Sequence, residues 1–172
     1  MLEQEILRTV SSLTHEQRVA FAAGVAERVL DIYAGVAKPY RSSVEAAIDA
    51  VWTATEIGEG NASRLRDLRV ELEDVTAPYA EEPDLGYSAL MAVSRAVDAA
   101  ITGDELMVEQ AALHARSAVD LTDRGEHGAA MEEDTFQRRW LQVCRRTDPS
   151  SLRAEFRNLN AERPGWLERW ES

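Results

Sequence analysis

The sequence contains a single cysteine, Cys144, so it cannot form an intramolecular disulfide or a zinc site built on several thiolates. A reducing compartment is the simplest setting for such a chain, and we expect the protein to be cytoplasmic. No apolar run approaches the roughly 20 residues that a membrane-spanning helix requires, so no membrane association is expected. The first ten residues carry charges at Glu3, Glu5 and Arg8, and we therefore expect no secretory signal peptide.

Histidines are also scarce, and the three are His15, His114 and His127. His114 has no partner at the spacing of a helical metal motif, and His127, four residues after Asp123, is interpreted as part of a solvated acidic loop rather than a divalent-ion site. The sequence lacks a nucleophile elbow, a phosphate-binding glycine loop and a zinc-protease motif. Cys144 lies on the apolar face of its predicted helix, where burial would make the thiol inert. We therefore expect no metal ion, no cofactor and no catalytic residue.

Positive charge is limited and unevenly distributed. The 19 basic residues face 31 acidic ones, which gives a formal net charge of −12 and argues against nucleic-acid binding. Residues 135–172 carry eight arginines against five acidic residues, a net charge of +3 that leaves −15 for residues 1–134. One interpretation is that oppositely charged helices pair within the domain. The other is that an acidic surface attracts a basic partner.

Helical periodicity accounts for most of the chain. Residues 15–36 show two apolar stripes, typical of a central helix buried on two sides, and Thr14 with Gln17 forms a capping-box pattern at its start. Residues 85–101 form the most apolar stretch. Asn61 and Asp104 are predicted to cap the helices that follow them. No strand pattern, repeat or long linker is present. The sequence therefore predicts an all-α fold in which residues 1–172 form one domain, a bundle of seven or eight mostly antiparallel helices.

Several of these helical segments resemble a known family. The stretch from Ala20 to Tyr33 is similar to the opening motif of the YjaG-like bacterial proteins, an uncharacterised all-helical family. Trp52, the Gly86–Leu90 segment and the Glu133–Leu141 segment resemble later family positions in the same order. The resemblance implies an all-helical fold, and it implies no activity.

The most informative charged residues lie on the apolar 85–101 helix. Arg95 and Asp98 are three residues apart, so an intrahelical ion pair is expected. The pair would form either a narrow solvent-facing strip or a buried network at the wall of a pocket. His114 lies on a largely apolar stripe of the next helix and is expected to be a core histidine. An enzyme would require Arg95, Asp98 and His114 to converge in one concave site.

Two further groups of residues are candidate binding elements. The acidic loop of Glu81, Glu82 and Asp84 is either solvated or a docking point for a basic partner. Trp166 and Trp170 either pack onto their own domain or anchor an interface, a role for which tryptophan is well suited.

These observations favour a non-catalytic protein-interaction module that binds a protein partner, possible partners being a basic protein or a second copy of the chain. An immunity-type protein that neutralises a basic toxin is the specific form considered. The alternatives are a small-ligand-binding or regulatory module, which predicts an apolar cavity between helices, and an enzyme with an unrecognised helical active site.

Overall fold

The computed structural model describes residues 2–30, 41–57, 61–81, 85–123, 128–162 and 164–171, and these ranges contain helices and turns but no strand. The predicted all-α helical bundle is thus confirmed. The helices are α1 (Leu2–Val10), α2 (His15–Arg28), α4 (Arg41–Ile57), α5 (Ala62–Thr76), α6 (Leu85–Thr102), α7 (Glu105–Asp123), α8 (Ala129–Arg146), α9 (Leu152–Leu159) and α10 (Gly165–Glu171), with short 3-10 turns η3 (Ala77–Tyr79) and η4 (Pro149–Ser151).

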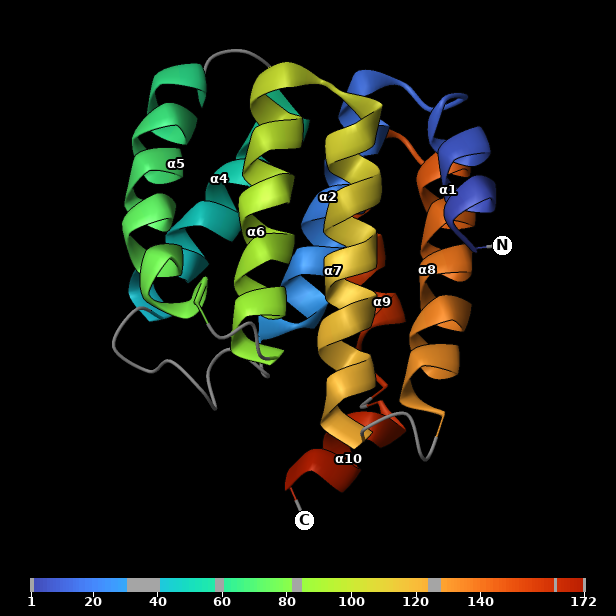
Figure 1. Ribbon diagram of the computed structural model, residues 1–172. Coiled ribbons are helices and arrows are strands. Elements are labelled where there is room, and N and C mark those ends of the chain that lie inside the picture. The colour runs from blue at the N-terminus through green and yellow to red at the C-terminus, as the bar shows by residue number, and fades with distance from the viewer. Residues whose placement is uncertain are drawn as a thin grey trace.

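Helix α2 occupies the centre of the bundle, as predicted from its two apolar stripes. It packs against α4, α6, α7, α8 and α9, while α6 and α7 form an antiparallel hairpin in front of it (Figure 1). The described side chains of both stripes, which include Phe21 and Val25, are buried. Helix α2 ends at Arg28, because the backbone of Val29 leaves helical geometry there (φ −94°, ψ 5°). The expected helix 15–36 is therefore interrupted at Val29; Leu30 is again helical, and positions 31–36 lie outside the described residues.

Capping explains where some of the helices begin. The Thr14 hydroxyl accepts a hydrogen bond from the Gln17 backbone N–H, and the Gln17 side chain accepts one from Thr14, which confirms the predicted capping box. Asp104 accepts a hydrogen bond from the Leu106 N–H at 2.9 Å and caps α7 as expected. Asn61, in contrast, does not cap α5. Its side-chain amide donates to the Ala50 carbonyl at 2.8 Å and instead joins α5 to α4.

An aromatic cluster fills the space between α2, α4, α8 and α9. The Phe156 ring lies 5.6 Å from Trp52 and 5.4 Å from Trp140, measured between ring centroids. Gly24 of α2 faces this cluster, and a Cβ atom at this position would lie 2.4 Å from Nε1 of Trp140. A glycine is therefore required where α2 passes beneath the two rings.

Candidate functional site

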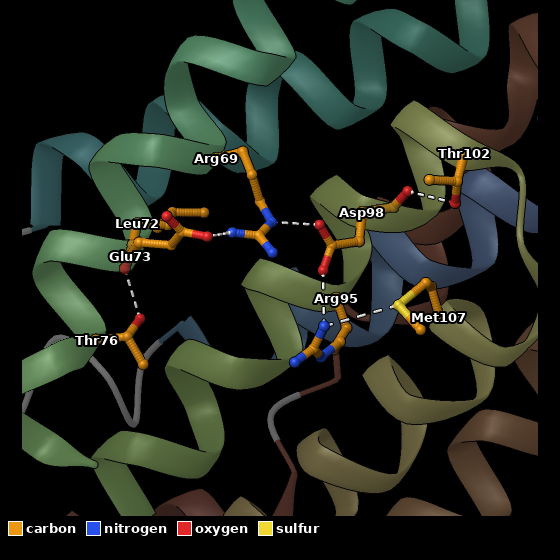
Figure 2. A network of polar contacts seen from close by, with 8 residues as sticks. All are labelled: Arg69, Leu72, Glu73, Thr76, Arg95, Asp98, Thr102 and Met107. Atoms are coloured by element: carbon orange, nitrogen blue, oxygen red, sulfur yellow. Dashed lines mark hydrogen bonds and ion pairs between the residues drawn. The ribbon is translucent and has the colours of Figure 1, made fainter.

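A network of charged side chains connects α5 to α6. Arg95 and Asp98 lie three residues apart on one face of α6, and Nη1 of Arg95 donates to Oδ2 of Asp98 at 2.8 Å. The second carboxylate oxygen, Oδ1, accepts a hydrogen bond from Nε of Arg69 on α5. Figure 2 shows the two guanidinium groups approaching Asp98 from different helices. Arg69 also pairs with Glu73 one turn further along α5.

Burial decides between the two interpretations of the Arg95–Asp98 pair. Asp98 is only 9% exposed, whereas the side chains of Arg95 and Arg69 are about a quarter exposed. The pair is therefore part of a half-buried network rather than a strip facing solvent. The hydrogen bond that Arg69 donates to Asp98 raises the pKa of Arg69, with burial acting in the opposite direction, so this guanidinium is charged at any physiological pH.

His114 lies near this network without joining it. Burial lowers the pKa of His114, and the positive charge of Arg95 lowers it further, so the imidazole is neutral near pH 7. No hydrogen bond connects His114 to Arg95 or Asp98. Nη1 of Arg95 instead approaches Sδ of Met107, one heptad before His114 on α7, at 3.7 Å. The nucleophile–base–orienter geometry of a catalytic site is not present among these three residues.

A small open cleft adjoins the network on the side of α5 and α6. Its volume is about 250 Å³. It is lined mainly by Arg69, Glu73 and Thr76 of α5 and by Tyr87, Met91, Ser94 and Arg95 of α6. Asp98 and His114 do not line it, so the cleft brings together two arginines rather than the three residues singled out from the sequence.

A second charged group is deeply buried between α2 and α8. Nε of Arg28 donates to Oε2 of the fully buried Glu133 at 2.7 Å, and Nη1 donates to the Asn160 side chain at 2.6 Å. The Arg28 guanidinium also lies 3.7 Å from the ring centroid of Phe136, and Gln137 donates to Oε1 of Glu133. Sequence reasoning missed this group. The spacing along α8 could have revealed it, because Glu133 and Gln137 lie on the same stripe of the helix as the apolar Trp140 and Cys144 and are therefore expected to be buried with them.

A larger cavity lies at the other end of α5, between the start of α2 and the end of α6. Its volume is about 610 Å³. Alanine, leucine and isoleucine side chains form its walls, and polar side chains join them from three helices, namely His15, Glu16, Arg66 and Thr102. Small-ligand sites are usually lined mainly by apolar groups, whereas polar atoms form more than half of the surface of this cavity.

The other residues singled out in the sequence lie in different environments. Glu81 is exposed, whereas Glu82 and Asp84 lie outside the described residues. Trp166 is fully buried and therefore packs within the domain, which leaves it unavailable as an interface anchor. The side chain of Trp170 lies outside the described residues. Burial raises the pKa of the Cys144 thiol, as its position on the apolar stripe suggests.

An exposed acidic face covers the outer side of α5, formed by Asp67, Glu71 and Asp74 around Val70. Val70 is 60% exposed although it is a large apolar residue. Within the described part of the chain, Asp67 and Asp74 form no ion pair, and Glu71 has only a long contact of 3.8 Å to Arg64. The acidic residues of α5 lie mainly in its C-terminal half and its last turn contains no basic residue, an order that the helix dipole disfavours.

Arginines of the C-terminal region neutralise acidic residues elsewhere in the bundle. Arg138 of α8 pairs with Glu5 of α1 at 3.0 Å, and Arg153 of α9 pairs with Asp49 of α4. This pairing within the domain accounts for part of the uneven charge along the sequence. It does not extend to the acidic face of α5, which lies at the far side of the bundle from α8 (Figure 1).

Comparison with known proteins gives no match: no family model, no curated protein and no solved structure is significantly similar to this chain. The resemblance to the YjaG-like family therefore stays a prediction. No described helix is long and apolar enough to cross a membrane. Within the same ranges, no group of three or more histidine, cysteine or acidic side chains could hold a metal ion.

Proposed function

We propose that this protein is a non-catalytic interaction module that captures a basic protein partner on the acidic face of α5. The observation that carries the proposal is the charge order of α5, which places acidic residues where the helix dipole disfavours them. Local departures from stabilising patterns are expected at functional sites, because there a partner supplies the missing compensation. An immunity-type protein that neutralises a basic toxin fits this chemistry.

The acidic face combines the two features that a docking surface needs. The exposed Val70 offers apolar area at its centre, and the surrounding carboxylates offer negative charge, of which only Glu71 has an ion-pair partner within the described residues, Arg64 at 3.8 Å. Complementary charge would speed the capture of a basic partner and make the rate sensitive to salt. Catalysis has weaker support, since the neutral His114 forms no hydrogen bond to Arg95 or Asp98 and does not line the cleft beside them.

Site-specific crosslinking tests this proposal directly. A photoreactive amino acid would replace Val70, and as a matched control it would replace Met131, which is 72% exposed on α8. In lysate of the native host, we expect the Val70 probe to crosslink one basic protein at low salt and to lose it at high salt, whereas the Met131 probe does not. Equal crosslinking from both positions, or crosslinking only to a second copy of the chain, would contradict a basic partner at this face.

Charge neutralisation provides the second part of the test. Replacing Asp67→Asn, Glu71→Gln and Asp74→Asn should abolish capture, because the complementary charge is removed. The matched control neutralises three exposed acidic residues at the other end of the chain, Asp148, Glu155 and Glu162, with the same change in net charge. If both triple variants lose the partner equally, the effect comes from net charge, and the acidic face of α5 is not the docking site.

A second candidate function is supported by the cavity of about 610 Å³. Its volume and its mixture of polar and apolar side chains support the small-ligand-binding or regulatory alternative. A thermal-shift screen with a metabolite library would test it, with Ala100→Trp as the variant that fills the cavity. A ligand that stabilises the native protein and fails to stabilise this variant would favour a ligand-binding module over the interaction module.

A further inference from the structure

The cleft between α5 and α6 contains hydrogen-bonding groups that the protein does not use itself. Arg69 employs Nε and Nη1 in its bonds to Asp98 and Glu73, and Arg95 employs Nη1 in its bond to Asp98. The Nη2 groups of both arginines form no hydrogen bond within the described part of the chain. Each of these guanidinium groups therefore retains donors in a fixed orientation, which suits a planar carboxylate.

Ser94 adds a hydroxyl group to the same cleft. The residue is only 7% exposed and lines the cleft from α6. Its hydroxyl forms no hydrogen bond with the described residues, and its oxygen is not among the fully buried atoms that lack a partner, so it is accessible from the cleft. Two guanidinium groups with free donors and an accessible hydroxyl thus line one cleft and can bind a polar ligand together.

The charge of the site determines which kind of ligand fits. Two arginines are balanced by two carboxylates, Asp98 and Glu73, so the cleft has no excess charge to favour a simple anion or a simple cation. Glu73 meets Arg69 through Oε1, and its side chain is mostly exposed at the cleft, which leaves Oε2 open to a cation. A ligand that carries both charges would satisfy the arginines and Glu73 together and keep the site neutral.

We propose that this cleft binds a small zwitterion of the α-amino-acid class. Its carboxylate would accept hydrogen bonds from the Nη2 groups of Arg69 and Arg95 and from the Ser94 hydroxyl, and its ammonium group would donate to Oε2 of Glu73. The volume of about 250 Å³ is below that of most drug-sized sites, and Met91 provides an apolar wall for a short side chain. This site is separate from the acidic face of α5 and does not depend on the interaction proposed there.

Nuclear magnetic resonance titration of the full chain with the twenty natural amino acids would test this inference. We expect saturable shifts of backbone amides along residues 69–77 and 87–95 with at least one small amino acid. The two half-ligands that match it, such as propionate and ethylammonium for alanine, should each bind at least about tenfold more weakly, because each engages only half of the charged groups. Absence of saturable binding by all twenty would overturn the proposal.

Three variants distinguish a zwitterion site from a simple anion site. Ser94→Ala leaves the ion pairs intact and should weaken amino-acid binding by about fivefold. Glu73→Gln should weaken the amino acid and strengthen the matching carboxylate, since the site then has an excess positive charge. Arg64→Gln, an exposed arginine on the outer side of α5, is the matched control and should change neither. A carboxylate that binds the unmodified protein as tightly as the amino acid would show an anion site and refute the zwitterion.

Discussion

The charged groups between α2 and α8 and between α5 and α6 differ in how accessible they are from solvent. Arg28 and Glu133 are buried between α2 and α8, and the guanidinium is enclosed by Glu133, Asn160 and the Phe136 ring. Arg69, Asp98 and Arg95 lie between α5 and α6, where the arginines keep free donors beside an open cleft. The first group is closed to solvent and positions helices, although Oε1 of its Gln137 has no hydrogen-bond partner among the described residues. The second adjoins a cleft and has donors that a ligand can reach. Neither burial nor an unused hydrogen-bonding group alone therefore identifies a functional charge; access from solvent is also required.

The largest predicted effect concerns the closed group. Glu133→Ala leaves Arg28 buried without its counter-ion and should lower the free energy of unfolding by about 3–5 kcal/mol. Replacing both partners by apolar residues, as in Arg28→Met with Glu133→Leu, should restore much of this loss because no charge is then left buried. Urea denaturation measures both. A loss below about 1 kcal/mol for the single variant would show that the buried pair is dispensable.

The open network should tolerate the corresponding change better. Asp98→Asn removes the shared carboxylate, but Arg69 and Arg95 can turn toward water, so we expect a loss of about 1–3 kcal/mol in the same assay. The comparison between the two groups fails if Asp98→Asn is as destabilising as Glu133→Ala. Arg41→Gln, which removes an exposed pair with Glu45, provides the reference for a surface contact and should have almost no effect.

A smaller change of opposite sign is expected on the acidic face. Glu71→Gln with Asp74→Asn removes negative charge near the C-terminal end of α5 and should stabilise the protein by about 0.3–1 kcal/mol. The same variant should capture the basic partner more slowly. Greater stability together with weaker capture would show that these residues are retained for binding. Unchanged or lower stability in urea denaturation would remove the argument from the helix dipole.

The smallest effect concerns pH. The pKa of His114 lies below its ordinary value near 6.5 in the folded protein, so the unfolded chain takes up a proton first as the pH falls through that value. Folding stability is therefore lost below about pH 6.5 until the folded form is protonated as well. The His114→Gln variant lacks this pH-dependent loss of stability. Urea midpoints at about pH 7.5 and about pH 5 should differ less in the variant than in the original protein, and an equal difference would contradict a depressed pKa.

Much of the fold was predictable because local patterns determine it. The apolar stripes of α2, the capping box at Thr14 and the i, i+3 spacing of Arg95 and Asp98 are all properties of short segments. Partners on other helices were not predictable. Arg69 reaches Asp98 from 29 positions away, and Glu133 reaches Arg28 from 105 positions away. A single sequence carries no direct record of such pairings, since they depend on how the helices pack.

The ends of helices were less predictable for a related reason. Asn61 is a good capping residue, yet its amide bonds to Ala50, because α4 offers a carbonyl at the right distance. The apolar pattern continues beyond Arg28, yet the backbone turns at Val29. In both cases a tertiary contact or a turn overrides the local helical preference. The cleft between α5 and α6 was also beyond prediction, because residues of two helices form it jointly.

The packing of two aromatic side chains against Gly24 has a consequence for how the chain folds during synthesis. Trp140 of α8 and Phe156 of α9 close over this position, and both follow it by more than a hundred residues. Helix α2 leaves the ribosome long before α8 and α9, so the part of its apolar surface around Gly24 has no native cover during most of translation. Contacts so distant in sequence also slow folding, because a long loop must close before they form. The central helix of this bundle is thus among the first to be made and among the last to be enclosed.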